Sequence, residues 1–287
     1  MGAPVDVSVV SGSNQATVPS TAFAQSLVVL VRDADSVPQA GIVVSFVAPV
    51  SGASCTLVGS IITDANGKVT LAATANATQG TYNVTFAVSG ATSALFVLKN
   101  ANATVVVLPF VSPDGAVQIA GGTFSWVNPS GLVSLAGPPA TANATLPNVS
   151  NSTNELHAEP WSQLNNIPAN ATITAITIKA SFRATIAGGS QVGIDFAKIG
   201  GATGGAGAAI NPLTTAFQVA QGTDSNVGVF NFTPANIAST FRVRAVCYGS
   251  TVETQYQTQA CQAQITYTTP PTPPLSTASS PLIFCEA

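Results

Sequence analysis

The stretch that decides the fold is N-N-I-P-A-N-A-T-I-T-A-I-T-I-K-A-S-F, residues Asn165–Phe182. After the turn signal at its proline, apolar residues alternate with Thr, Lys and Ser, which predicts a β-strand with one face in a core and the other in water. The alternation slips at Ala175-Ile176, which indicates a β-bulge. Because a strand that buries one face needs a second sheet to cover it, the sequence predicts a β-sandwich.

The chain is poor in charge for its length. Its 287 residues include 8 Lys and Arg and 11 Asp and Glu, for a net charge of −3, whereas about a quarter of the residues in average soluble proteins are charged. Because a monomer usually stays soluble through mixed surface charge, this composition favours a subunit covered by its neighbours. The basic residues are scattered, so we expect no nucleic-acid partner.

The sequence carries no signal for a membrane span or a secretory leader. Its longest apolar runs, such as Leu27–Val31 and Val105–Val111, are far shorter than the roughly 20 residues that a spanning helix needs. The N-terminus, M-G-A-P-V-D-V, lacks a basic start and an apolar core. We therefore expect a protein that stays where it is made, or a mature or engineered form.

The four cysteines, Cys55, Cys247, Cys261 and Cys285, are too scattered for a disulfide framework and form no C-x-x-C pair for zinc or redox chemistry. Cys247 and Cys261 lie in alternating runs that would suit neighbouring strands, so a bond between them is one alternative. Burial as free thiols, which pack as small apolar groups, is the favoured one. The redox compartment stays open.

The first third of the chain shows short alternating runs separated by turn signals, including the hairpin turn Asp64–Gly67, at the spacing typical of a sandwich. Residues 5–99 resemble the bacterial Ig-like repeats of invasin- and intimin-type adhesins and of many tailed-phage virion proteins. The motifs are V-x-D-A-x-x-x-P-Q-A-G-I-V-V-S-F, T-D-A-N-G-K-V and G-T-Y-N-V-T-F-A-V-S-G. The resemblance implies an immunoglobulin-like sandwich that serves as a spacer or a surface-binding module.

The polar seam Lys99–Thr104 predicts a domain boundary. We expect an immunoglobulin-like domain over residues 1–100, a larger β-sandwich over 101–268 and a Pro-rich arm over 269–287. The second region resembles the jelly-roll-like sandwiches of tailed-phage structural proteins through W-x-N-P and I-P-A-N-A-T-I-T-x-I. Within it, Ala136–Asn154 and the Gly-rich Gly200–Ala209 are expected to be loops.

The arm combines a polyproline-like start with an apolar tip, Leu282, Ile283 and Phe284. An apolar tip favours docking on a neighbouring subunit, so these three residues are the predicted subunit contact. A disordered tail is the alternative.

Two groups of residues are candidates for metal binding. Glu155, His157 and Glu159 alternate, so in a strand they would project to one side and could seed a divalent-cation site. Asp33 and Asp35 could hold calcium together with backbone carbonyls. The favoured interpretations are a solvated strand face and ordinary turn residues, so no metal or cofactor is predicted.

Catalytic chemistry has little support. Hydrolysis of a polysaccharide would need a carboxylate pair in a cleft, for which Asp195 with Asp224 or Glu253 are the candidates. A Ser-His-Asp triad lacks a G-x-S-x-G elbow near His157. Trp161 and Tyr256 could stack on sugar rings, although core packing is favoured. We predict no catalytic residue and no enzyme.

The resemblances imply a structural protein of a tailed-phage virion, either a capsid decoration or head fibre or a tail component. Its expected partners are copies of itself, other virion proteins and a host-surface glycan bound weakly by the Ig-like domain. Its expected location is the virion, assembled in the host cytoplasm. The alternative is a bacterial cell-surface adhesin or surface-layer fragment.

Overall fold

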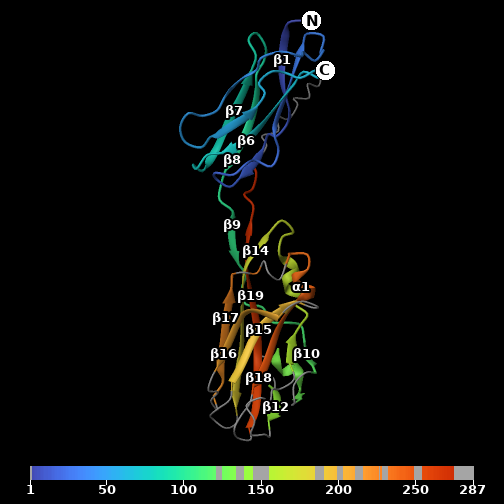
Figure 1. The fold of residues 1–287 in the computed structure, drawn as a ribbon, viewed down its shortest axis with the longest axis vertical. Helices are drawn as coiled ribbons and strands as arrows, with labels where there is room; N and C mark the ends of the chain where they lie inside the picture. Colours follow the sequence, from blue (N-terminus) through green and yellow to red (C-terminus); the bar gives the residue numbers. More distant parts are fainter. Residues whose placement is uncertain are drawn as a thin grey trace, which may run out of the picture. The chain divides into compact units, whose positions relative to one another are not determined.

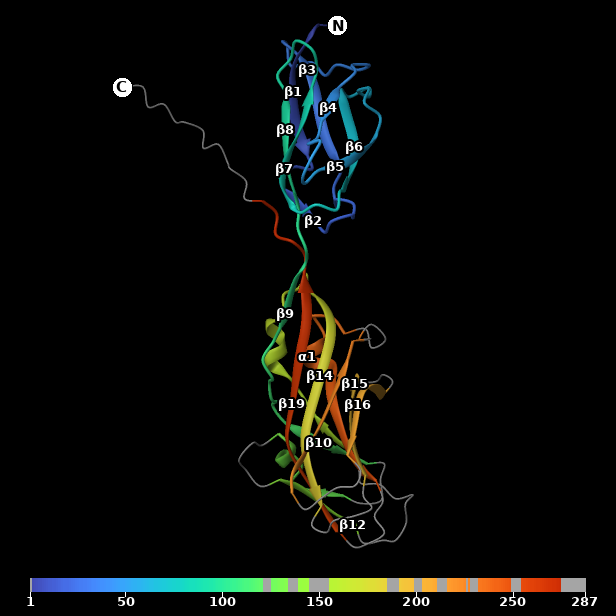
Figure 2. The same ribbon diagram turned by 90° about the vertical axis from the view of Figure 1, so that its left-hand side faces the viewer.

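The computed structural model describes residues 2–120, 125–133, 139–144, 155–184, 191–198, 203–210, 216–225, 227, 232–248 and 254–274. The chain divides into two compact units, one over Met1–Thr104 with the residues from Pro270 onward and one over Val105–Thr269. Strands dominate the described parts of both units, so the chain is all-β, as predicted (Figures 1 and 2). Among these residues, no helix combines the length and the apolar character needed to cross a membrane.

The first unit is a sandwich of two four-stranded sheets. Their orders are β1-β3-β6-β5 and β2-β8-β7-β4, with β2 parallel to β8 and the other pairs antiparallel. This is the ABED and GFC arrangement of an immunoglobulin sandwich, with β2 added beside the last strand. The strands are β1 (Pro4–Ser11), β2 (Gln15–Thr17), β3 (Leu27–Asp33), β4 (Ser45–Val47), β5 (Cys55–Gly59), β6 (Lys68–Ala75), β7 (Gly80–Ala87) and β8 (Ala94–Asn100).

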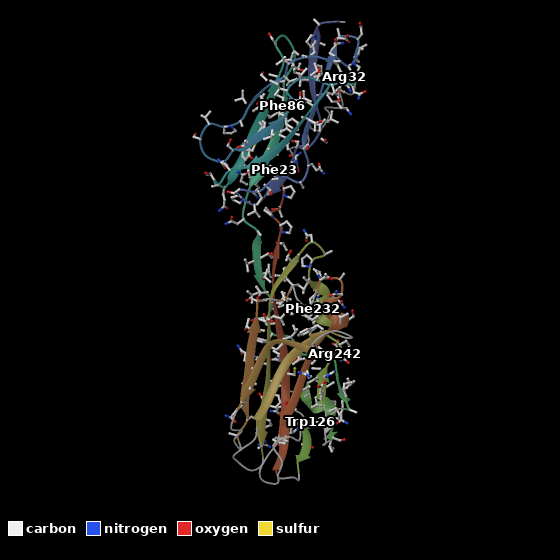
Figure 3. The ribbon with its side chains drawn as sticks, viewed as in Figure 1. Phe23, Arg32, Phe86, Trp126, Phe232 and Arg242 are labelled. Carbon is white, nitrogen blue, oxygen red and sulfur yellow. The ribbon has the colours of Figure 1, made fainter. Side chains whose placement is uncertain are left out.

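Local sequence explains this unit well. Along β6 the side chains of Val69, Leu71 and Ala73 are buried while their neighbours face outward, as a period of two requires. The core aromatics Phe86 and Phe96 lie 5.0 Å apart between ring centroids, and Figure 3 labels Phe86. The predicted turn also forms, since the Asp64 carboxylate accepts hydrogen bonds from the backbone N–H groups of Asn66 and Lys68 at 2.8 and 2.9 Å.

The second unit is a sandwich of a five-stranded and a six-stranded sheet. The orders are β10-β13-β18-β15-β16 and β11-β12-β19-β14-β17, with β9 also beside β19. The strands are β9 (Thr104–Val107), β10 (Ala116–Ile119), β11 (Trp126–Val127), β12 (Ala140–Ala144), β13 (Glu155–Ala158), β14 (Thr172–Ala184), β15 (Gln191–Lys198), β16 (Thr203–Ile210), β17 (Gln218–Asp224), β18 (Phe241–Tyr248) and β19 (Thr254–Thr269).

The eight strands from β12 to β19 have jelly-roll connectivity. Strands β12, β19, β14 and β17 form one sheet, while β13, β18, β15 and β16 form the other, which is the order that two Greek keys produce. The predicted jelly-roll-like sandwich is therefore confirmed as a fold.

The strand predicted from Asn165–Phe182 lies at the centre of this unit as β14. Ile176, Ile178 and Phe182 are fully buried. The predicted slip is a register shift between Ile173 and Ala175 in the pairing with β19. A second shift follows between Lys179 and Ser181, opposite Ala260, whose φ is 58°. The first bulge lies on β14 and the second on β19, and β14 pairs with both β17 and β19.

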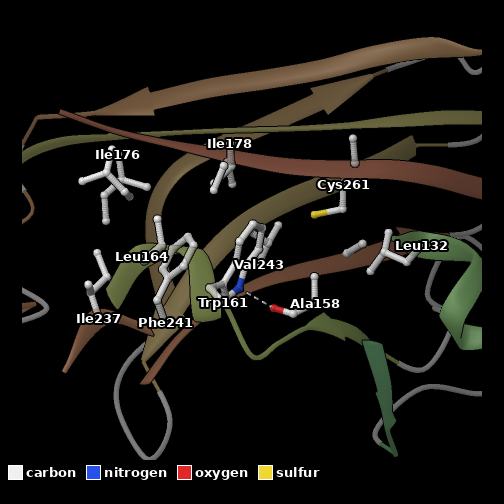
Figure 4. Close-up of a cluster of buried hydrophobic side chains, with 14 of the residues drawn as sticks. Leu132, Ala158, Trp161, Leu164, Ile176, Ile178, Ile237, Phe241, Val243 and Cys261 are labelled. Carbon is white, nitrogen blue, oxygen red and sulfur yellow. Dashed lines mark hydrogen bonds between the residues drawn. The ribbon is translucent and has the colours of Figure 1, made fainter. Parts of the chain in front are cut away.

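The core of the second unit is built around aromatic rings that short helices position. The helices are η1 (Pro129–Leu132), η2 (Ser162–Asn166) and α1 (Ile237–Thr240). Trp161, just before η2, packs 5.2 Å from Phe241 between ring centroids, and its Nε1–H donates to the Ala158 carbonyl at 2.8 Å (Figure 4). Buried indole N–H groups need such a partner, so this hydrogen bond fixes the ring in the core.

Two predicted loops contain strands instead. The Gly-rich segment Gly200–Ala209 contributes β16, whose backbone pairs antiparallel with β15, and Ala136–Asn154 contributes β12 between β11 and β19. Both segments lack the apolar alternation that marks a strand, but β propensity depends strongly on the neighbouring strand. These segments form strands because the backbone groups of β15 and β19 are available to pair with them.

The cysteine pairing considered from the sequence does not occur. Cys247 lies on β18 and Cys261 on β19, and these strands belong to different sheets. Cys261 is a free, fully buried thiol, as the favoured interpretation expected, and burial raises its pKa. Cys55 is also free, and desolvation raises its pKa despite a hydrogen bond with Tyr82. Cys285 lies outside the described residues.

Candidate functional site

The acidic residues proposed as cation ligands are paired with arginines. Glu155 contacts His157 Nε2 at 2.8 Å and Arg244 Nη1 at 2.9 Å. Arg242, labelled in Figure 3, lies 3.2 Å from Glu159 and donates to His157 Nδ1 at 2.9 Å. Within the described part of the chain, no three His, Cys, Asp or Glu side chains are grouped to hold a metal. Two guanidinium groups on β18 lie beside these ligands, which the sequence could not show.

The hydrogen bonds of this network also assign the proton on His157. Its Nδ1 accepts from Arg242, so its Nε2 carries the proton and donates to Glu155. Burial alone would raise the pKa of Glu155, but the hydrogen bond from His157 and the charge of Arg244 together hold it below its ordinary value. His157 is buried rather than solvated, so the network is an ion-paired element of the sheet.

The aspartates proposed for calcium organise a turn. One oxygen of Asp33 accepts from the backbone N–H groups of Asp35 and Val37, at 3.1 and 2.9 Å. The other accepts from Gln39 Nε2 at 2.8 Å. The turn interpretation is therefore correct, and the Asp33 carboxylate is already used by the protein itself.

Asp195 on β15 and Asp224 on β17 lie on strands of different sheets, and Glu253 lies outside the described residues, so this carboxylate pair remains a candidate from the sequence alone. Trp161 and Tyr256 are buried and offer no ring for a sugar. Leu282, Ile283 and Phe284 also lie outside the described residues, so the subunit contact remains a prediction.

A different surface has the properties of a binding site. The side chains of β14, β17 and β19 that point away from the core form a polar surface, which we call the amide face. It comprises Thr177, Lys179, Ser181, Arg183, Val219, Gln221, Thr223, Gln257, Gln259, Gln262 and Gln264.

Strand register arranges these residues in rows across the sheet. Lys179 pairs with Gln221 on one side and with Gln262 on the other. Ser181 pairs likewise with Val219 and Gln259. Neighbouring strands lie about 4.8 Å apart, so each row presents several hydrogen-bonding groups on a rigid backbone.

The amide face is hollowed at the second bulge of the sheet. A depression of about 370 Å³ is lined by Lys179, Ala180, Ser181, Val219, Gln221, Ala260 and Gln262. The extra residue, Ala260, adopts a left-handed φ of 58°, and such bulges locally bend and twist a strand. None of the described residues that line the depression carries a carboxylate.

Both cations of the amide face are held by aromatic rings. Lys179 Nζ lies 3.8 Å from the centroid of Phe110, and Arg183 Cζ lies 4.5 Å from that of Phe217. Arg183 Nε also donates to Gln257 Oε1 at 2.6 Å. Such contacts fix the cations in place. Beside these cations lie the neutral amides of Gln221, Gln259 and Gln262 and the hydroxyl of Ser181.

Sequence reasoning missed this surface although a signal was present. Glutamine occupies alternate positions at residues 255, 257 and 259 and again at 262 and 264, with the slip at the bulge. Alternation of one polar type along a strand marks a uniform outward face. Its partners on β14 and β17 come from more than 30 residues earlier in the chain, so the face itself could not be assembled from the sequence.

No family model matches the chain, and no curated protein matches it either. Among solved structures it is similar to a family 30 carbohydrate-binding module of a Clostridium thermocellum cellulosomal cellulase, with 12% identity and a TM-score of 0.29 over 54% of this chain and 88% of that chain. It is also similar to SGBP-B from a complex xyloglucan utilization locus in Bacteroides uniformis, with 14% identity and a TM-score of 0.30. The match covers 92% of this chain and 73% of that chain.

A third similar structure is that of infectious bursal disease virus, Gx strain, with 9% identity and a TM-score of 0.24. The match covers 93% of this chain and 71% of that chain. These TM-scores are too low to carry an argument about function. With no matching family model, the resemblances to bacterial Ig-like repeats and to phage jelly rolls remain predictions.

Proposed function

We propose that this chain is a non-catalytic structural protein of a tailed-phage virion that adheres to neutral glycans through the amide face. The observation that carries adhesion is the arrangement of Gln221, Lys179 and Gln262 in one row beside the depression. An amide both donates and accepts hydrogen bonds without charge, which matches the hydroxyl groups of a neutral sugar. Multivalent display in a particle would compensate for weak single contacts.

The sequence placed adhesion in the Ig-like domain, whereas the amide face belongs to the jelly-roll unit. The virion assignment is supported by the low charge of the chain and by the two resemblances. A bacterial surface adhesin would use the same face, so the alternative differs only in where the protein is found. Mass spectrometry of purified particles separates the two, because a virion protein must be present in them at a stoichiometric level.

Binding is tested by affinity gel electrophoresis and calorimetry of the full chain with a panel of neutral polysaccharides. The Gln221→Ala/Gln262→Ala variant should weaken affinity about tenfold, since each lost hydrogen bond contributes roughly 0.5–1.5 kcal/mol. Gln163→Ala is the matched control, because Gln163 is exposed in the same unit on η2, outside the amide face. Equal weakening by both variants, or binding by neither variant nor wild type, would overturn the proposal.

A further inference from the structure

The first unit has an apolar surface along one side, which we call the apolar edge. Seven side chains contribute to it, and Val47 and Val58 are 67% and 68% exposed. The seven are Val43, Phe46, Val47, Val50, Val58, Ile61 and Ile62. Apolar side chains concentrated in so short a stretch usually mark an interaction surface, whereas scattered ones need no explanation.

The apolar edge lies where the outermost strands of the two sheets come together. Strands β4 and β5 are each the last strand of their sheet. A bridge between Val43 and Ile62 connects them, and the Val44 N–H donates to the Ile61 carbonyl at 2.8 Å. Outer strands present unpaired backbone N–H and C=O groups, which can pair with another strand.

Nothing in the sequence of this region protects the edge by charge. From Ser36 to Thr63 the chain contains no Asp, Glu, Lys, Arg or His. Soluble proteins commonly place Lys or an inward-pointing charge on such strands to prevent pairing. An uncharged, apolar outer strand fits a partner that is also uncharged and apolar.

The arm of the chain contains a segment of that kind. Leu282, Ile283 and Phe284 follow one another, with no charged residue between Thr268 and Cys285. A polyproline-like spacer rises about 3.1 Å per residue, so the stretch from Thr269 to Leu282 can span about 40 Å. A spacer of that length is compatible with a tip that contacts a second copy.

We propose that the apolar edge of one copy is the receptor for the Leu282–Phe284 segment of a second copy. The segment adds as a strand beside β4 or β5, where backbone hydrogen bonds give affinity and alternate side chains give specificity. This inference rests on the proposed role as an assembly subunit, and it supplies the surface on which the predicted subunit contact acts.

The test uses two full-length variants and light scattering after size exclusion. Leu282→Asp/Phe284→Asp removes the segment, and Val47→Asp/Val58→Asp removes the edge. Each variant alone should be monomeric where the wild type is oligomeric. An equimolar mixture should regain hetero-oligomers, because the first variant retains the edge and the second retains the segment. Val107→Asp is the control, since Val107 is 57% exposed on β9 and should not change the mass.

Several outcomes would overturn the inference. A monomeric wild type would mean that the segment binds its own chain or nothing, and oligomers of either variant alone would mean that another surface assembles the protein. The melting temperature of each variant checks folding, and that of Val47→Asp/Val58→Asp should be nearly unchanged because both valines are exposed. Glycan binding of the wild type is measured in parallel. A wild type that is monomeric but binds glycan would contradict the docking of the arm and leave the adhesive role intact. A wild type that is oligomeric but binds no glycan would contradict the adhesive role and leave the docking of the arm intact.

Discussion

The two sandwiches of this chain treat their outer surfaces differently. The first leaves an apolar, charge-free edge exposed on β4 and β5. The second covers the outer face of β14, β17 and β19 mainly with neutral amides and hydroxyls, and the two cations there, Lys179 and Arg183, lie against aromatic rings. Charge is used sparingly in both, but the reasons differ: charge on an outer strand would prevent strand addition, whereas charge on the amide face would favour ionic ligands over neutral sugars.

Four cations of the second unit are each in contact with an acidic or aromatic side chain. Arg242 and Arg244 pair with Glu159 and Glu155, while Lys179 and Arg183 lie against Phe110 and Phe217. Each of these four cations makes a contact with another side chain of the unit. Low overall charge is thus compatible with a well-specified surface, because the few charges serve mainly as structural contacts.

The largest expected effect comes from substitutions that empty part of one core at a time and so test whether the two units unfold independently. Trp161→Ala and Phe86→Ala should each lower the free energy of unfolding of their own unit by about 3–5 kcal/mol, because each empties a buried aromatic site. The chain has two tryptophans, both in the second unit, so tryptophan fluorescence in urea reports on that unit and circular dichroism on both. A fluorescence transition that Phe86→Ala shifts as much as Trp161→Ala would show that the units unfold as one.

A smaller effect concerns the ion-paired network, which has no counterpart among the described residues of the first unit. The pKa of Glu155 is held below the ordinary 4.5, so its ionised form stabilises the fold above that pH, and the stabilisation is lost as pH falls through the lowered value. Melting temperatures measured from neutral to acidic pH should fall more steeply for wild type than for Glu155→Gln and converge at low pH. Asp35→Asn, at an exposed turn, should follow the wild-type curve; parallel curves for Glu155→Gln and wild type would contradict the assignment.

The smallest effect tests the bulge that hollows the amide face. Ala260→Gly should raise the free energy of unfolding by about 0.5–1 kcal/mol, because a left-handed φ costs an L-residue energy that glycine avoids. Ala263→Gly on the same strand is the control and should destabilise instead, since Ala263 is buried and outside the left-handed positions. Chemical denaturation measures both, and a destabilising Ala260→Gly would show that the bulge is not under backbone strain.

Much of the fold was predictable because local patterns carry it. The alternation in Ile173–Phe182 and its slip predicted β14 with its bulge, and the residues Asp64–Gly67 predicted the turn that they form. Most of the candidate site was not predictable. The alternating residues Glu155, His157 and Glu159 resembled metal ligands because the arginines beside them come from β18, 83 or more residues later in the chain.

The sequence by itself determined the all-β class, the central strand and the shortage of charge, because side-chain period and composition are properties of neighbouring residues. Tertiary structure alone decided that Thr203–Ile210 is a strand, that the glutamines of β19 align with Lys179 and Gln221, and that β4 and β5 are left at the edges. Strand pairing joins residues far apart in the chain, and register between distant strands has no local signature.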